Sequence, residues 1–520
     1  MRISCSLVLA ALVSMVIPGC GGDDDDAAQQ QSACKTDDPT TCPKGNVCEA
    51  QASGNACVPG CSRDYADSCD TGLVCEEIQG AKPQCFAPVE IRGKVVDALS
   101  TDAIEAARVA ARDDTGAIAQ KIAVSAKDGT YTLSISTPRN DDGSPVKSSV
   151  TLRGDASKYA SFPSGLRPAL PVDLSTATAS TDAAPAGDHG GKVWVIENPL
   201  TTLALLPLPD STGLGTLKGK VDAENAGGTL VTAGSSTGIA DVDGEFVVFN
   251  VPAGPATVHG YAANLQLTPV DVTVKADAEV KDIVLSPAST ALATVSGGVN
   301  LVNAGGLSST SVVLVVEETF IEALEVGEVP KGLRADNVTN SFSISGVPEG
   351  KYVVLASLDN DGLVRDPDTS IAGTDIVHIE VKNGAAQSGL SFKVTGALAV
   401  VSPGADGPEE VTGNPTFTWA DDSSEDGYEV VVFDAFGNKI WEDLAVPSVK
   451  GNKNVEMTYS GPALDIGMYY QFRATSMKSG VPISRTEQLR GVFIAKLYSA
   501  HRARRENSSQ SRRFCFQWSL

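Results

Sequence analysis

Cysteine is the residue whose spacing in this chain points most directly to chemistry. Eight of the eleven cysteines lie between residues 34 and 85, in two copies of a four-cysteine pattern. The gaps between successive cysteines are seven, five and eight residues in the first copy, and seven, five and nine in the second. Thiols gathered in this way can cross-link to one another or bind zinc. The eight residues are Cys34, Cys42, Cys48, Cys57, Cys61, Cys69, Cys75 and Cys85.

Disulfide bonds are the chemistry that we expect of this cluster, because each copy contains almost no apolar residues. Such a segment cannot fold by hydrophobic burial alone, so covalent cross-links must stabilise it. We expect two bridges per copy, although the spacing does not reveal which cysteines pair. A zinc site is the alternative. Against it, the segment has neither the C-x-x-C pairs nor the histidines that structural zinc sites use.

No residue of the chain is predicted to be catalytic. Residues 234–238 match the G-x-S-x-G pattern of a hydrolase nucleophile, but glycine and alanine surround them and no helix signal follows, so we interpret them as a loop. The chain has only four histidines, and none has a partner at metal-site spacing. They are His189, His259, His378 and His501. We therefore expect a protein that is not an enzyme.

One acidic loop offers oxygen ligands for a hard cation. Asp359, Asp361, Asp366 and Asp368 lie within ten residues. Calcium binds several such oxygens at a flexible turn, so these aspartates form a candidate calcium site. The loop does not match the EF-hand pattern, and a solvated turn rich in Asp and Asn explains the same composition. We expect no other cofactor, because no phosphate-binding glycine loop or dinucleotide fingerprint occurs.

Short strands and turns are the elements that must position these groups. The 520 residues include 50 glycines and 28 prolines but only 5% aromatic residues, a composition that favours strands over long helices. Apolar alternation predicts one strand at 91–97, which opens a unit, and another at 131–135, which follows a hairpin turn at 128–129. We also expect a strand within 103–112 and a loop over 174–191. The predicted fold is all-β: tandem β-sandwich modules that follow a small disulfide-rich segment at 34–87.

An internal repeat divides the body into units. The pattern F-x-[VI]-x-x-V-P-x-G begins at Phe246 and again at Phe342, and predicts a strand, a Pro-Gly turn and a returning strand. With the G-x-V and D-G-x-[YF] segments upstream, it resembles the carboxypeptidase regulatory-like family, a non-catalytic, transthyretin-like β-sandwich. The resemblance implies that 213–288 and 294–396 are such modules, the second with Thr339 and Asn340 in place of the D-G turn. It extends to 88–200, where the V-P-x-G segment is missing.

Residues 398–495 have a different signature. Trp419 ends the segment N-P-T-F-T-W, and Tyr470 is the tyrosine of L-x-x-G-x-x-Y-x-F-x-A. These segments resemble a fibronectin type III-like domain. The resemblance implies that Trp419 lies in the core and that the Tyr470 hydroxyl ties a strand to a neighbouring loop.

The first residues resemble an export signal. Arg2 precedes an apolar run, residues 7–17, that is too short to span a bilayer comfortably but suits a signal peptide. The tetrapeptide Ile-Pro-Gly-Cys that ends at Cys20 resembles the lipobox of bacterial lipoproteins. This resemblance implies a signal peptide at 1–19, a lipidated Cys20 and, because Gly21 follows it, a place at the cell outer membrane. Residues 20–33 would be the anchor and an acidic flexible tether.

The charge of the chain limits its partners. A net charge of −24 repels nucleic acid and anionic lipid surfaces, although residues 496–520 carry six basic residues and one acid and are expected to be a disordered tail. We expect membrane contact through the lipid anchor, a surface protein or glycan as partner, and no nucleic acid. The predicted function is non-catalytic adhesion or recognition at the bacterial surface. The alternatives are an envelope spacer or assembly component, and a glycan-active hydrolase with an unrecognised site.

Overall fold

The computed structural model describes residues 34–496, except for 66, 168, 303–309, 359–375, 396, 452 and 488–489. Within these residues, strands make up nearly all the regular structure, and no α-helix occurs. Nor does any helix there have the length and apolar character needed to cross a membrane. The predicted all-β class is confirmed. The short helices are single 3-10 turns: η1 (Pro39–Thr41), η2 (Leu174–Thr176), η3 (Pro199–Thr201) and η4 (Glu317–Thr319).

The disulfide-rich segment, residues 34–87, is named the cysteine arm here. Each of its two repeats contains one antiparallel hairpin. The first hairpin places Cys48 opposite Cys57, and the second places Cys75 opposite Cys85. The four strands are β1 (Asn46–Gln51), β2 (Gly54–Pro59), β3 (Val74–Glu76) and β4 (Gln84–Phe86).

Two sandwiches of seven strands follow one strand order. In sandwich 2, a three-stranded sheet β17-β14-β20 packs on a four-stranded sheet β16-β15-β18-β19; in sandwich 3 the orders are β24-β21-β27 and β23-β22-β25-β26. Sandwich 2 consists of β14 (Leu214–Val221), β15 (Leu230–Ala233), β16 (Ser236–Ile239), β17 (Glu245–Pro252), β18 (Gly254–Tyr261), β19 (Val270–Val274) and β20 (Glu279–Leu285). Sandwich 3 consists of β21 (Ala293–Val302), β22 (Thr310–Val316), β23 (Arg334–Val338), β24 (Ser341–Val347), β25 (Gly350–Leu358), β26 (Val377–Val381) and β27 (Gln387–Thr395).

Sandwich 1 repeats this order with two additions. Its sheets are β10-β9-β6-β7 and β11-β12-β5-β13, with β8 paired to β5. Strands β8, β5 and β13 therefore correspond to β17, β14 and β20, while β11 and β12 are extra. The strands are β5 (Val89–Asp97), β6 (Arg108–Arg112), β7 (Ala123–Val124), β8 (Thr130–Ile135), β9 (Ser149–Asp155), β10 (Val172–Asp173), β11 (Thr178–Ala179), β12 (Trp194–Ile196) and β13 (Thr202–Leu205).

The strand expected within 103–112 is present as β6, Arg108–Arg112. Two other expectations for sandwich 1 need correction. The unit does not end at residue 200, because β13 pairs with β5 and buries Leu203 and Leu205 in the same core. The segment 174–191 is not wholly a loop, since it contains η2 and β11. These elements are two to four residues long, which is too short for a periodic pattern to reveal.

A glycine opposite an aromatic ring recurs in the three sandwiches. Gly93 lies opposite Tyr131, Gly219 opposite Phe246, and Gly297 opposite Phe342. A Cβ atom added to any of the three glycines would lie closer than 3.0 Å to backbone of the strand or turn on its other side: Thr201, Ile283 and Leu390, respectively. This close approach is the physical reason for the glycine of each G-x-V segment.

The turn before the aromatic strand also recurs. The backbone N–H of Val95 donates to Gly129 O, that of Val221 to Gly244 O, and that of Val299 to Asn340 O, at 2.7–2.8 Å. The first two acceptors, Gly129 and Gly244, are the glycines of D-G turns and have positive φ. Asn340 accepts the same hydrogen bond without a positive φ. The missing D-G sequence in sandwich 3 therefore leaves the hydrogen bond intact.

The C-terminal sandwich consists of sheets β28-β30-β33 and β29-β36-β34-β31-β32, with β35 on β34. Trp419 is fully buried, and the Tyr470 hydroxyl accepts a 2.8 Å hydrogen bond from the Asp465 backbone N–H. Both expected roles are therefore present. The strands are β28 (Val400–Ser402), β29 (Glu409–Thr412), β30 (Thr416–Trp419), β31 (Gly427–Asp434), β32 (Lys439–Pro447), β33 (Val455–Thr458), β34 (Tyr469–Lys478), β35 (Val481–Arg485) and β36 (Val492–Lys496).

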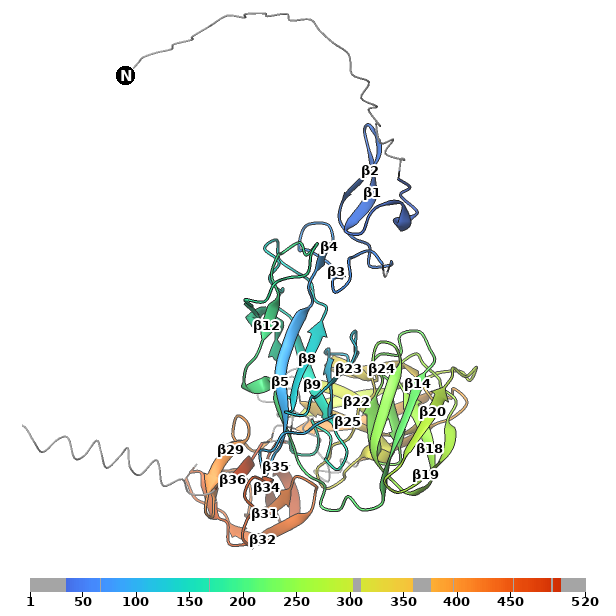
Figure 1. The fold of residues 1–520 in the computed structure, drawn as a ribbon. Coiled ribbons are helices and arrows are strands. Elements are labelled where there is room, and N and C mark those ends of the chain that lie inside the picture. The colour runs from blue at the N-terminus through green and yellow to red at the C-terminus, as the bar shows by residue number, and fades with distance from the viewer. Residues whose placement is uncertain are drawn as a thin grey trace, which may run out of the picture.

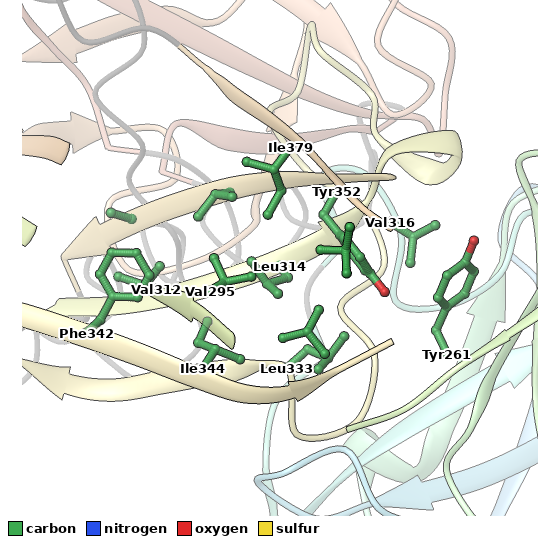
Figure 2. Close-up of a cluster of buried hydrophobic side chains, with 14 of the residues drawn as sticks. Tyr261, Val295, Val312, Leu314, Val316, Leu333, Phe342, Ile344, Tyr352 and Ile379 are labelled. Carbon is green, nitrogen blue, oxygen red and sulfur yellow. The ribbon is translucent and has the colours of Figure 1, made fainter. Parts of the chain in front are cut away.

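Sandwich 1 has neighbours on several sides (Figure 1). The cysteine arm projects from one end of it, and the C-terminal sandwich lies near the other end. Sandwiches 2 and 3 pack beside it, and one cluster of buried side chains includes residues from all three sandwiches. Figure 2 shows Tyr261 of sandwich 2 beside Tyr352 of sandwich 3, with ring centroids 5.9 Å apart. The described units thus form a packed body.

Candidate functional site: a buried ionic junction

The eight clustered cysteines form four disulfide bonds, as predicted. Each repeat joins its first cysteine to its third and its second to its fourth: Cys34–Cys48, Cys42–Cys57, Cys61–Cys75 and Cys69–Cys85. Several of these sulfur atoms lie within 4.8 Å of one another, as they would in a metal site. A sulfur atom in a disulfide has no thiolate to offer zinc. The structure therefore favours the disulfide interpretation of the cluster over the zinc alternative.

The G-x-S-x-G segment lies in a hairpin. Gly234 lies between β15 and β16, whose residues pair across the turn, and the Ser236 hydroxyl donates to Asn250 O at 2.8 Å. A hydrolase nucleophile needs a sharp turn from a strand into a helix, with its hydroxyl free. The segment is thus a strand connection, as the loop interpretation implied, although Ser236 itself lies in β16.

The described histidines make structural contacts. His189 packs edge-on against Phe86, His259 stacks on Tyr261, and His378 Nδ1 lies 2.7 Å from Glu317 Oε1. None of the three belongs to a group of residues placed to hold a metal among the described residues. Some predicted site residues lie outside the described part of the chain: Cys20, Asp359, Asp361, Asp366, Asp368 and His501.

A group of buried and half-buried charges lies where sandwiches 1, 2 and 3 meet, and is named the ionic junction here. Arg153 of β9 is fully buried at its centre. Its Nε donates to Asp155 Oδ2 at 2.8 Å and its Nη2 to Thr237 Oγ1 of β16 at 2.8 Å, while its Nη1 donates to Glu328 Oε1 of sandwich 3. Arg112 of β6 lies 3.9 Å from the other Glu328 oxygen. One guanidinium group thus binds all three sandwiches.

Burial and opposite charge act against each other on Glu328. Burial alone would raise its pKa, but Arg153 and Arg112 outweigh that effect and hold the Glu328 pKa below its ordinary value. Burial lowers the pKa of Arg112, and Glu328 only partly offsets this. Arg153 itself has no exposed surface, while the Glu328 side chain is 18% exposed. The contacts of the junction join the three sandwiches.

The Glu328 pKa shift predicts a specific pH dependence. Because the pKa is lower in the folded protein than in the unfolded chain, the stabilising contribution is complete above the unfolded value of about 4.3 and is lost as the pH falls through the folded value. Denaturant titrations between about pH 6 and about pH 3 should show the wild type losing more unfolding free energy than Glu328→Gln. Parallel curves for the two proteins would contradict the assignment.

Further contacts surround the ionic junction. Lys331 Nζ donates to Asn225 O and Gly227 O of sandwich 2, at 2.6 and 2.8 Å. The next residue, Gly332, donates its N–H to Thr115 O of sandwich 1 at 3.0 Å. The side chain of Asn250, in β17, donates to Ala156 O and Tyr159 O of sandwich 1. In each of these bonds the acceptor is a backbone carbonyl oxygen of one sandwich and the donor belongs to another. Carbonyl groups in the loops between sandwiches therefore have hydrogen-bond partners.

The C-terminal sandwich packs on sandwiches 1 and 3. Arg485 Nη1 donates to Glu325 Oε1 at 2.9 Å. The guanidinium group of Arg167 lies between the rings of Phe162 and Tyr469, about 5 Å from each centroid. Beside them, a small cluster buries Leu166, Leu324 and Val492, one from each of the three units.

The ionic junction was not predicted, although the sequence contains part of its signal. All seven residues of β22 are buried, including the run Val312–Val316. A continuous apolar run of this kind indicates a strand covered on both faces, which an isolated sandwich exposed to solvent does not need. Strand β6 shows a shorter run of the same kind: the three residues between Arg108 and Arg112 are all apolar and buried. These patterns show that a second face is buried, but not what covers it.

No protein-family model matches the sequence, and no curated protein sequence matches it. Among solved structures, a DUF3823 family protein from Bacteroides ovatus is 11% identical over 39% of this chain and 98% of its own, with a TM-score of 0.18. The major pilin subunit BcpA of Bacillus cereus is 8% identical over 59% of this chain and 98% of its own, with a TM-score of 0.16. Fibronectin(III)-like modules of Clostridium thermocellum CbhA are 13% identical over 39% of this chain and 91% of theirs, with a TM-score of 0.13. Likenesses this low carry no functional argument, and the resemblances to lipoproteins and to carboxypeptidase regulatory-like modules stay predictions.

Proposed function

We propose that this chain is a lipid-anchored, non-catalytic protein of the bacterial outer membrane that displays a body of packed β-sandwiches for adhesion or for recognition of a protein or glycan. The observation that supports it best is the pairing of all eight clustered cysteines. Disulfides persist in oxidising compartments outside the cytosol, which agrees with the export signal expected at residues 1–19.

The body offers the kind of surface that such a function uses. In tandem β-sandwiches, partners bind at connecting loops and at exposed strand edges. The buried Arg153 lies at the ionic junction, where its contacts hold the three sandwiches together. The three described histidines make structural contacts and the G-x-S-x-G serine lies in a hairpin, so neither feature favours the hydrolase alternative.

Replacing the proposed anchor tests the first part of this function. We expect Cys20→Ala to remain unprocessed or to leave the membrane fraction, because no sulfur is then available for acylation. Cys5→Ala, which changes a cysteine inside the expected signal peptide, is the matched control and should stay membrane-bound. Fractionation followed by intact mass measurement gives the result. Unchanged membrane association and mass for Cys20→Ala would contradict the anchor.

A binding screen tests the second part. The membrane-extracted protein, presented to envelope glycans and to surface proteins, should retain a partner that the Cys20→Ala protein also binds, since the sandwiches and not the lipid make the contact. A stoichiometric envelope partner recovered after mild crosslinking would instead support the assembly-component alternative. Turnover of a glycan, abolished by one Asp or Glu substitution, would support the hydrolase.

A further inference from the structure

The joint between the cysteine arm and sandwich 1 is built around one buried arginine. Arg139, between β8 and β9, has no exposed surface. Its Nε donates to Glu76 Oε2 of the arm at 2.6 Å, and its Nη2 donates to Ala87 O at 2.8 Å. The guanidinium carbon also lies 5.3 Å from the centre of the ring of Phe86, the last residue of β4. One side chain of sandwich 1 therefore contacts β3, β4 and the residue that follows β4.

Backbone hydrogen bonds cross the same joint in both directions. The Gln79 N–H donates to Arg139 O at 2.9 Å, and the Arg139 N–H donates to Glu77 O at 2.8 Å. The His189 N–H donates to Cys85 O at 2.8 Å, from a loop that follows β11. These bonds pair the arm with two separate segments of sandwich 1, as neighbouring strands would pair within one sheet.

Phe86 fills the space between those segments. Its side chain is 1% exposed. A Cβ atom added to Gly143 would lie 3.3 Å from the ring, and one added to Gly190 would lie 3.5 Å from it. The two glycines therefore let two separate loops of sandwich 1 close on the ring. The ring cannot swing out unless these loops separate.

The joint between the two repeats of the arm is also hydrogen-bonded. The Gly45 N–H donates to Ser68 O at 2.8 Å, the Gly60 N–H to Gly45 O at 3.0 Å, and the Cys61 N–H to Pro83 O at 3.0 Å. Gly60 itself packs on Val47, whose methyl group lies 2.9 Å from where a Cβ atom would be. Flexible linkers between domains are exposed and make few contacts, unlike either joint here.

From these joints we propose that the cysteine arm and sandwich 1 form one rigid post, which holds the C-terminal sandwich at a fixed distance and orientation from the start of the arm. Strand β5 leaves the arm at Val89, and the turn after its other end places Leu99 against Gly467 of the C-terminal sandwich. The nine residues of β5 span about 30 Å. Figure 1 shows the arm and the C-terminal sandwich toward opposite ends of sandwich 1.

The post also places the C-terminal sandwich relative to the proposed anchor, and this step rests on the proposed function. If Cys20 is anchored, the arm is the folded unit that follows the tether, and the C-terminal sandwich lies at the other end of the post. That sandwich carries acidic Asp421, Asp422 and Asp426 in the loop before β31. The far end of the same strand, at Asp434, lies against sandwich 3 through the turn that contains Gly437. The loop that contains these aspartates is thus at the end of the C-terminal sandwich that faces away from sandwich 3.

Distance measurements on the full chain test the rigid post. Spin labels on noncanonical residues at Gln51 of the arm and at exposed Leu444 of β32 avoid the native cysteines. We expect one narrow distribution of distances in the wild type. Arg139→Ala should lose this single peak, because it removes the buried bonds to Glu76 and Ala87. A broad wild-type distribution would overturn the proposal. The wild-type measurement tests the proposal by itself, so the test holds even if Arg139→Ala does not fold.

A nearby exposed ion pair provides the matched control. Arg63 lies 2.6 Å from Glu77, but both side chains are more than half exposed. Arg63→Ala should keep the narrow distribution, and broadening to the extent of Arg139→Ala would show that any arm substitution loosens the structure. The Cys20→Ala protein should give the wild-type distances. A wild-type protein that carries no lipid at Cys20 but shows a narrow distribution would reject the proposed anchor while supporting the post.

Discussion

Arg153→Ala is expected to lower the free energy of unfolding by about 3–5 kcal/mol, the usual cost of removing one partner from a buried ion pair. The arginine is fully buried and binds Asp155, Thr237 and Glu328. Without it, the two carboxylates lose their compensating charge inside the body, where water cannot replace it. Because these groups come from three sandwiches, the loss should also weaken the coupling between units.

Equilibrium denaturation followed by two probes would measure both effects. Wild-type sandwiches 1, 2 and 3 should unfold in one transition, whereas Arg153→Ala should show separate transitions in addition to the lower stability. Lys218→Ala is the matched control, because it removes an exposed pair with Glu279 on the surface of sandwich 2 and should change stability by about 1 kcal/mol or less. Equal effects of the two substitutions, or a wild type that already unfolds in steps, would refute a junction that couples the units.

Gly297→Ala should destabilise sandwich 3 by about 1–3 kcal/mol or more, the range for overpacking a close-packed interior. A Cβ atom at this position would lie 2.8 Å from both the carbonyl carbon and the Cβ of Leu390, on the parallel neighbour β27. Backbone must move to relieve that contact, since no flexible side chain can turn away. The opposite neighbour is Phe342, whose ring belongs to the core.

The adjacent glycine, Gly298, provides the matched control for this substitution. Gly298 lies in the same strand, but the nearest atom to its added Cβ is Asn340 O, at an ordinary 3.5 Å. Gly298→Ala should therefore be neutral or stabilising by about 0.5–1 kcal/mol, because alanine restricts the unfolded chain more than glycine does. Denaturant midpoints for the two variants, compared with the wild type, give the answer. A Gly298→Ala protein as unstable as Gly297→Ala would argue against close approach as the cause.

Patterns between nearby residues determined much of this fold. The alternation of apolar residues, the turn at residues 128–129 and the repeated segments at Phe246 and Phe342 indicated an all-β chain of sandwiches. The scarcity of apolar residues between Cys34 and Cys85 required covalent cross-links. Such signals are local, since each depends on a strand face, a turn or a spacing that spans about ten residues or fewer.

Tertiary structure alone decided how these parts join. It selected one of the three disulfide pairings open to each four-cysteine repeat, because only folding brings particular sulfur atoms together. It also showed that the pairing of β13 with β5 extends sandwich 1 past residue 200. The ionic junction is the clearest case. Arg153 and Glu328 are 175 residues apart, and no local sequence pattern around either residue identifies the other as its partner. A sequence can show that a charge or an apolar face must be covered, but its partner depends on how distant strands pack in space.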